Sequence, residues 1–179
     1  TALVITLNTR LTIGGNEAPA FGSFLSPQHG FWQNAEAVSE SYTADLKFSQ
    51  LNGKVDVYLD DRLVPHIFAE QENDAYFVQG FLHSKFRLWQ MEFQAYAAAG
   101  RLGEILGNKD ERILNFDRNM RRLGMVYAAE IALQQMNNDP VIKSQCDAYT
   151  AGVNAYIETL TESTLPLEYK LIGYKPEKW

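Results

Sequence analysis

Few side chains in this sequence combine the types and spacings that chemistry requires. The three histidines, His29, His66 and His83, do not stand at the spacing of metal ligands, and no CxxC or HExxH pattern occurs. The patterns of a nucleophilic serine elbow, a phosphate-binding loop and a dinucleotide-binding turn are also absent. We therefore predict no catalytic residue, metal ligand or cofactor site within this chain, and the sequence assigns no substrate-binding residue.

The best local candidate for a polar site is the stripe His83, Arg87, Gln90 and Gln94. These residues are spaced by four, three and four, which places them on one face of a helix. An arginine on an otherwise apolar helix needs a carboxylate or carbonyl partner, because an unpaired buried charge is very costly. Glu92 falls on another face, so we expect the partner to come from elsewhere. The first interpretation is a structural ion pair or interface contact, and the second is ligand binding.

Three other positions invite a chemical interpretation, and each has a simpler structural one. Cys146 lies on an apolar helix stripe without basic neighbours in the sequence, which indicates a small buried side chain. Asp60-Asp61 precedes an arginine and is typical of a turn. A chain that begins with Thr1 can use its own amine as the base for the hydroxyl, but a cleavage boundary explains a first threonine equally well.

A strand pair and a long helix are predicted to carry these residues. Val55–Leu59 alternates apolar and polar residues, as a half-buried strand does, and His66–Ala69 is predicted to return beside it. A helix is predicted from Glu72 or Asn73, with Asn73 the better cap, to Gly100. Its apolar residues form two stripes, so we expect it to be buried on most sides. The stripes are Val78, Leu82, Phe86, Trp89, Phe93 and Tyr96, and Phe77, Phe81, Leu88 and Ala95.

Two more helices are predicted in the second half of the chain. Residues Asn119–Met136 form one of them, and Asp139-Pro140 opens the other with a capping carboxylate and a proline at the first helical position. The tail Leu165–Trp179 is predicted as loop and strand. Inward-facing residues of the first of these helices are Met120, Leu123, Tyr127 and Ile131.

Residues 1–52 are predicted to form an extended arm with turns, and residues 53–179 an incomplete domain. In the arm, Ala2–Leu7 is apolar and then stops at Asn8, so it is either the end of a removed signal or anchor segment or a first strand. The arm also contains several aromatic residues, which predicts that it packs onto other parts of the protein.

Composition narrows the class of protein further. The 179 residues suit one domain of ordinary size, and a hydrophobic fraction of 46% is enough for a core. The net charge of -6 argues against nucleic-acid binding. A single cysteine excludes an internal disulfide, and no apolar stretch approaches the length of a membrane span.

An ordered series of sequence blocks from about Val55 to Trp179 resembles the N-terminal part of the α chain in the penicillin acylase family of N-terminal nucleophile hydrolases. Any one block is weakly specific, but the series occurs in order and with compatible spacing. Phe86 departs from the family, because many relatives have Asp before the Arg-Leu of the helix, and this removes one candidate partner for Arg87. The blocks are Val64–Ile67, Gly80–His83, Arg87–Glu92, Ala99–Gly107, Phe116–Arg121, Tyr149–Tyr156 and Gly173–Trp179.

The resemblance implies a precursor that cuts itself into an α chain and a larger β chain. In this family, which includes N-acyl-homoserine-lactone acylases, the nucleophile is the first residue of the β chain and uses its own amine as base. The resemblance places the residues that line the acyl pocket, and the α-chain ligand of a structural calcium ion, beyond Trp179. We therefore expect this chain to lack the nucleophile, to be inactive alone and to have its own β chain as partner.

These observations lead to an expected fold and function. The fold is α+β and mostly helical, with long buried helices and a short β-hairpin, and the resemblance makes it a fragment of a four-layer αββα architecture. The whole protein is expected to hydrolyse an acyl amide through an acyl-enzyme, and to be exported in a bacterial type of cell, either periplasmic or membrane-anchored through a preceding segment. The alternative is a non-catalytic helical domain used for binding or assembly.

Overall fold

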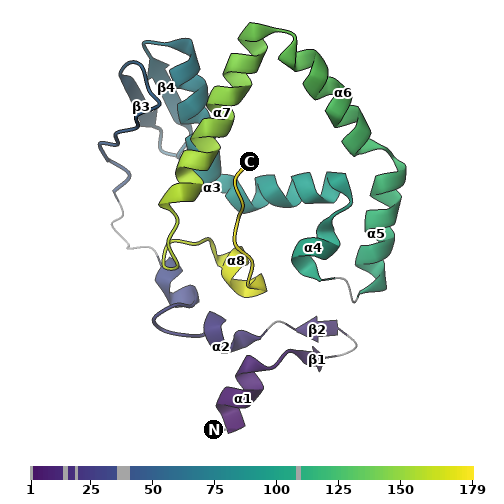
Figure 1. Ribbon diagram of the computed structural model, residues 1–179. Coiled ribbons are helices and arrows are strands. Elements are labelled where there is room, and N and C mark those ends of the chain that lie inside the picture. Colours follow the sequence, from purple (N-terminus) through teal and green to yellow (C-terminus); the bar gives the residue numbers. More distant parts are fainter. Residues whose placement is uncertain (1, 14–15, 19, 36–40, 108–109) are drawn as a thin grey trace. The chain divides into compact units, whose positions relative to one another are not determined.

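The computed structural model describes residues 2–13, 16–18, 20–35, 41–107 and 110–179 (Figure 1). Its content of helices with two short antiparallel hairpins confirms the predicted α+β, mostly helical class. The chain divides into two compact units, and the long helix α3 (Glu72–Ala99) contributes to both. The hairpin unit comprises Thr43–Glu92, Gly124–Thr159 and Glu177–Trp179, and the arm unit comprises Thr1–Tyr42, Phe93–Leu123 and Leu160–Pro176.

The predicted strand pair is present in the hairpin unit. Strand β3 (Val55–Leu59) pairs antiparallel with β4 (Pro65–Ala69). The turn between them is closed by the Asp60 carboxylate, which accepts the backbone N–H groups of Arg62 at 2.9 Å and Val64 at 2.8 Å. The turn interpretation of Asp60-Asp61 is therefore confirmed for Asp60.

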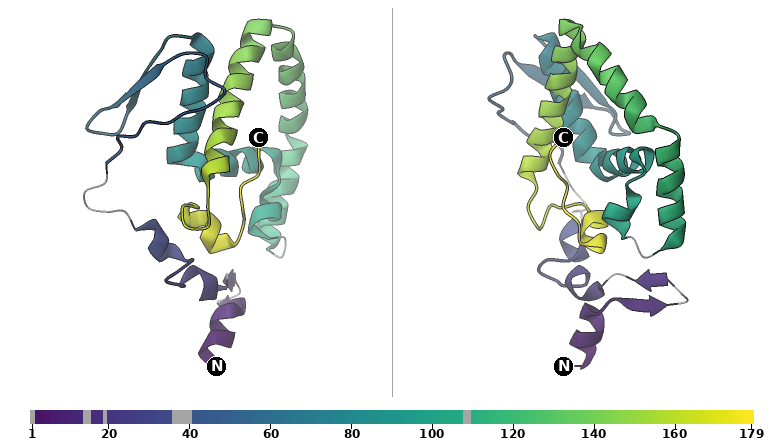
Figure 2. Two further views of the ribbon diagram at one scale, coloured as in Figure 1. Left: turned by 60° about the vertical axis from the view of Figure 1, so that its left-hand side comes forward. Right: turned by 45° about the vertical axis from the view of Figure 1, so that its right-hand side comes forward.

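Helix α7 (Pro140–Thr159) lies beside α3 in the views of Figures 1 and 2. Two glycines allow the backbones to approach closely. A Cβ atom at Gly80 would lie 2.1 Å from the carbonyl oxygen of Tyr149, and one at Gly152 would lie 1.9 Å from that of Phe77. Any side chain at these two positions would push the helices apart.

The core of the hairpin unit forms where these helices meet the β-hairpin. Phe77, Val78, Phe81 and Ala155 are buried there. Phe48 packs its ring against Phe77 and Phe81, with centroid distances of 5.2 and 5.0 Å. A residue from the predicted arm therefore closes this core. The partly buried residues around the core are Phe48, Leu51, Val55, Ile67, Leu82, Ala151 and Tyr156.

The ends of the two long helices were predicted with different success. Asp139 caps α7 as expected, because its carboxylate accepts the N–H groups of Val141 at 2.9 Å and Ile142 at 3.2 Å. Helix α3 begins at Glu72, so the prediction that Asn73 is its cap is wrong. The predicted end is confirmed, because Gly100 adopts a left-handed φ of 64° directly after Ala99.

The single helix predicted over residues 119–136 is wrong. The structure has two helices, α5 (Glu111–Arg122) and α6 (Met125–Asn137), because Gly124 adopts a left-handed φ of 72° between them. Of the residues predicted to face inward, Met120 is half-buried, whereas Leu123 and Tyr127 are 70% and 69% exposed and Ile131 is exposed too. The apolar period is present in the sequence, but in the described structure three of its four side chains are exposed.

The beginning of the arm unit is more regular than predicted. Ala2–Asn8 forms helix α1, so the strand interpretation of this run is wrong. A short apolar run fits either element by periodicity alone. The other elements are the hairpin β1 (Leu11–Ile13) and β2 (Asn16–Ala18), helix α2 (Phe21–Phe24) and the 3₁₀ helix η1 (Phe31–Asn34).

The rest of the arm unit contains α4 (Leu102–Leu106), α5 and α8 (Leu167–Ile172). The tail was predicted as loop and strand, but its first part is helix α8, which buries Tyr169 completely. Tyr174 stacks on Tyr169 with ring centroids 6.0 Å apart, and its hydroxyl lies 3.0 Å from that of Tyr96. These aromatic contacts explain why the segment folds onto α8 instead of extending as a strand.

Candidate functional site

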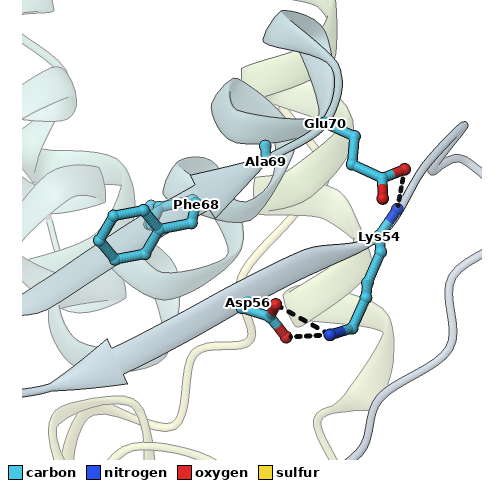
Figure 3. Close-up of a pocket in the computed structure, with 6 residues that line it drawn as sticks. Lys54, Asp56, Phe68, Ala69 and Glu70 are labelled. Carbon is cyan, nitrogen blue, oxygen red and sulfur yellow. Dashed lines mark hydrogen bonds and ion pairs between the residues drawn. The ribbon is translucent and has the colours of Figure 1, made fainter.

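The β3–β4 hairpin carries a shallow pocket with three charged residues (Figure 3). The Lys54 ammonium contacts both oxygens of Asp56, at 2.8 and 2.9 Å, and Glu70 accepts the backbone N–H of Lys54 at 3.2 Å. The hydrogen bond to Asp56 raises the pKa of Lys54, so the amine stays protonated and cannot act as a base at neutral pH. The pocket thus holds an exposed ion pair rather than acid–base machinery.

The polar stripe predicted on α3 does not form a buried charged site. His83 Nδ1 lies 3.0 Å from the hydroxyl of Tyr149, and the rings meet edge to face. Arg87, Gln90 and Gln94 are exposed. Arg87 also interrupts the helix, with φ of -145° and ψ of 17°. Arg87 is therefore exposed in this structure, and its role in an ion pair, an interface or a ligand site stays a prediction.

The remaining predicted positions show no activated group. Cys146 is a free thiol and is half-buried on α7, so the prediction of full burial holds only in part. Thr1 lies outside the described residues. Burial raises the pKa of the Tyr149 and Tyr156 hydroxyls, which keeps both phenols protonated at neutral pH. In the described ranges, no group of three or more His, Cys, Asp or Glu side chains could hold a metal ion.

The sequence interpretation missed the buried carboxylates, which prove to organise the fold. Asp74 is 1% exposed, and its oxygens accept the N–H groups of Asn52 at 3.0 and 3.2 Å and of Gly53 at 2.8 Å. The carboxylate thereby fixes the approach of the chain to β3. Glu92, on α3, is likewise only 3% exposed. The partners of Asp74 are more than twenty residues away, so local spacing gave no signal for them.

Asp117, on α5, holds the start of α4. Its two carboxylate oxygens accept the N–H groups of Leu102 at 2.9 Å and Gly103 at 2.8 Å, which are the first two of that helix. Such groups have no partner within their own helix, and the N-cap Arg101 makes no side-chain capping bond. Arg121 Nε donates to the Gly100 carbonyl at 2.8 Å. Two side chains of α5 therefore fix the turn between α3 and α4.

Arg101 and Lys170 are held by partners in the arm unit. Arg101 forms a bidentate pair with Glu104 at 2.9 and 2.7 Å, and this hydrogen bonding lowers the pKa of Glu104. Lys170 donates to the Asn34 side chain at 2.6 Å and to the Ser163 carbonyl at 3.0 Å, and burial lowers the pKa of its amine. These contacts join elements of the unit and present no cluster of free catalytic groups.

In the described part of the chain, buried carboxylates bind backbone N–H groups, glycines allow helices to approach closely, and several exposed charges pair with neighbours in the sequence. None of its helices is long and apolar enough to cross a membrane, within the residues that the structure describes.

Known proteins share both the sequence and the fold of this scaffold. The family model described as penicillin amidase matches residues 54–179. A penicillin acylase 2 proenzyme from Pseudomonas sp. (strain SE83) is 35% identical over 144 residues, which cover 80% of this chain and 18% of that protein. The acyl-homoserine lactone acylase QuiP of Pseudomonas aeruginosa is 37% identical over 116 residues, which cover 65% of this chain and 13% of that protein.

A solved structure gives an independent comparison of the fold. The thermostable penicillin G acylase from Alcaligenes faecalis superposes with a TM-score of 0.62 and 24% sequence identity, over 71% of this chain and 66% of that chain. This likeness shows a shared fold. The chain spans less than a fifth of the length of the two curated relatives described above.

Proposed function

Because this chain belongs to the penicillin amidase family, we propose that it is the front part of the α chain of an amidohydrolase. The family match over residues 54–179 is the observation that carries the proposal. The similar proteins are named as acylases of penicillin and of acyl-homoserine lactones. Both names refer to compounds in which an acyl group is joined to nitrogen, so an acyl amide is the substrate class that we propose here.

We propose that the reaction proceeds through an acyl-enzyme whose nucleophile lies on a β chain from the same precursor. The nucleophile adds to the amide carbonyl, the C–N bond breaks, and the amine leaves with a proton. Water then hydrolyses the acyl-enzyme, which releases the acid and restores the nucleophile. The word proenzyme in the name of one relative supports a precursor.

A buried serine of this chain, Ser84 in α3, has a structural partner. Its hydroxyl donates to the Gly80 carbonyl at 2.9 Å, which supports a structural role for Ser84 and not a role as the nucleophile.

The role proposed for this chain is to support the catalytic chain. Its helices α6 and α7 expose large apolar side chains, including Tyr127, Leu133 and Val141. Exposed apolar surface of this kind usually marks an interface. A covering β chain accounts for the apolar side chains of α6, none of which is buried in the described structure.

Amide hydrolysis by the whole gene product tests this function. We expect release of the amine from penicillin G or from an N-acyl-homoserine lactone by the whole gene product, and none by residues 1–179 alone. Alanine in place of the first residue of the β chain should abolish the activity, whereas Thr1→Ala should leave it unchanged. Amidase activity of residues 1–179 alone would contradict the proposal.

The alternative function is a non-catalytic helical domain for binding or assembly. It predicts a gene product that ends with this chain, folds as a stable monomer and hydrolyses no amide. The exposed side chains of α6 favour the acylase proposal. A stable monomer seldom contains a helix that has no buried residue, as α6 does here.

We also propose that the whole protein is exported and that it binds a structural calcium ion outside this chain. The resemblance described for residues 55–179 supports the calcium ion. The apolar run Ala2–Leu7, interpreted as the end of a signal or anchor segment, supports export. Fractionation of cells into periplasm, membrane and cytoplasm tests export. Metal analysis of the whole protein before and after treatment with a chelator tests the ion, and a protein that contains no calcium would contradict this part.

A further inference from the structure

Helix α1 exposes apolar side chains around its circumference. Leu3, Val4 and Ile5 are 70%, 61% and 62% exposed. Consecutive residues of a helix point about 100° apart, so these three side chains face three different directions. The helix contains no charged residue, and the first charge that follows is Arg10. Helices that are apolar on all sides occur in protein cores or in lipid.

Side chains at the C-terminal end of α1 bond to the helix backbone. The Thr9 hydroxyl donates to the Ile5 carbonyl at 2.8 Å, and the Thr9 N–H donates to the Thr6 carbonyl at 3.2 Å. The Asn8 side-chain amide donates to the Val4 carbonyl at 2.9 Å. The polar residues of this segment therefore gather at its C-terminal end, next to Arg10, and leave Leu3, Val4 and Ile5 as an apolar stretch.

Aromatic residues gather in the elements that follow α1. Helix α2 packs against α1, and a Cβ atom at Gly22 would lie 2.3 Å from the Asn8 side chain. The Phe24 ring stacks on Phe31 at 5.4 Å, and Phe31 contacts Trp32 at 4.4 Å. Trp32 is nevertheless 58% exposed. Tryptophan is enriched where a membrane meets water, because its ring is apolar and its N–H needs a polar partner.

We propose that α1 inserts into the hydrocarbon layer of a phospholipid bilayer, with Arg10 at the level of the headgroups and Trp32 as an interfacial anchor. The seven residues of α1 extend about 10 Å, roughly a third of the thickness of the hydrocarbon layer, so the helix as described reaches part of the way in. Arg10 is exposed beside the helix end, where a cation attracts lipid phosphates.

Lipid fits α1 better than a protein groove does. A groove covers one side of a helix and selects it by a polar or charged rim, whereas α1 is apolar in three directions and carries no charge. This inference goes beyond the proposed amidohydrolase function and does not depend on it.

Flotation of residues 1–179 with vesicles of phosphatidylethanolamine and phosphatidylglycerol tests the proposal. We expect the chain to float with the vesicles, and the double substitution Leu3→Ser with Ile5→Ser to weaken the partition at least about tenfold. Leu133→Ser is the matched control, because Leu133 is 55% exposed on α6, and it should leave the partition unchanged. Circular dichroism checks that each variant folds.

Fluorescence gives a second measurement that does not rely on the α1 substitutions. Vesicles should shift the tryptophan emission to the blue, and Trp32→Phe should remove most of that shift. The proposal is overturned if the unmodified chain does not bind vesicles, or if Leu133→Ser weakens binding as much as the α1 substitutions do. It is also overturned if the α1 substitutions dissociate a dimer of this chain and leave vesicle binding unchanged.

Discussion

At the scale of single residues, buried carboxylates and left-handed glycines set the local geometry of this chain. Asp74 and Asp117 are almost fully buried, and each accepts two or more backbone N–H groups from another segment. Hydrogen bonds to a charged acceptor are stronger than neutral ones. Because each of these carboxylates makes several such bonds, its loss should destabilise the whole turn that it holds.

We expect Asp117→Ala to lower the free energy of unfolding by roughly 2–4 kcal/mol, because it leaves the N–H groups of Leu102 and Gly103 without their acceptor. Asp117→Asn keeps one oxygen and should lose about half as much. Asp110→Ala is the control, since Asp110 caps α5 from a more exposed position, and it should cost clearly less than Asp117→Ala. Equal losses for Asp117→Ala and Asp110→Ala in urea titrations would show that the buried carboxylate has no special role.

Gly100 and Gly124 form a matched pair for a test of backbone geometry. Both have positive φ, 64° and 72°, but a Cβ atom at Gly100 would lie 2.5 Å from the Asp117 carbonyl oxygen, whereas one at Gly124 would meet nothing within 4 Å. Alanine at Gly124 should therefore cost about 1 kcal/mol from its φ alone. Alanine at Gly100 adds a clash and should cost roughly 2–4 kcal/mol. The thermal midpoints of the two variants measure the difference, and equal midpoints would contradict it.

The candidate site illustrates what sequence spacing can and cannot reveal about residues. Spacing placed His83, Arg87 and Gln90 on one helix face, but it could not show that this face is exposed. Spacing also gave the cap at Asp139, because a cap and its N–H partners are neighbours in the chain. The role of Asp117 depends on partners that are distant in sequence, and only the folded chain brings them together.

At the scale of elements, the crossing of α3 and α7 is the best-defined feature of the hairpin unit. Gly80 and Gly152 each face a backbone carbonyl of the opposite helix, and Phe81 packs edge to face on Tyr156 at 5.7 Å. Both helices were predictable from their apolar period, and α7 also from its cap at Asp139. The close approach of the two helices was not predictable, because a glycine in a helical sequence does not reveal which other segment packs against it.

Alanine at Gly80 or Gly152 tests the closeness of this crossing. Each substitution should favour an isolated helix by up to about 1 kcal/mol, yet we expect a net loss of about 1–3 kcal/mol because the Cβ atom separates the helices. The double variant should lose less than the sum of the two, since one separation accommodates both side chains. Stabilisation by either single substitution, measured in urea, would show that the helices are not in close contact.

Sequence also predicted one helix where the structure has α5 and α6, and the reason lies at Gly124. The apolar period of Met120, Leu123, Tyr127 and Ile131 continues across this glycine, so the pattern alone favoured an unbroken helix. The spacing of apolar residues predicts which face of a helix is buried. It does not predict whether the backbone stays helical at a glycine such as Gly124, which adopts a positive φ without strain.

At the scale of the whole molecule, the described part of the chain leaves the apolar side chains of one helix exposed. Helix α6 has no buried residue, and its exposed side chains include Val126, Tyr127 and Leu133. Helix α7, in the same unit, buries Gly152, Val153 and Ala155. Local stability follows the number of buried apolar contacts, so these two helices should differ strongly in how often they open.

Hydrogen exchange measures that difference and connects it with the proposed partner. In residues 1–179 alone, we expect the amides of α6 to exchange much faster than those of α7, because nothing within the unit buries α6. In the whole gene product, a covering β chain should protect α6 and leave α7 nearly as it was, so α7 is the internal control. If α6 is already as protected as α7 in residues 1–179, its apolar side chains need no partner, and the scaffold role then loses its structural support. If α6 stays unprotected in an active whole enzyme, the β chain covers another surface, and the apolar period of α6 must serve a different contact.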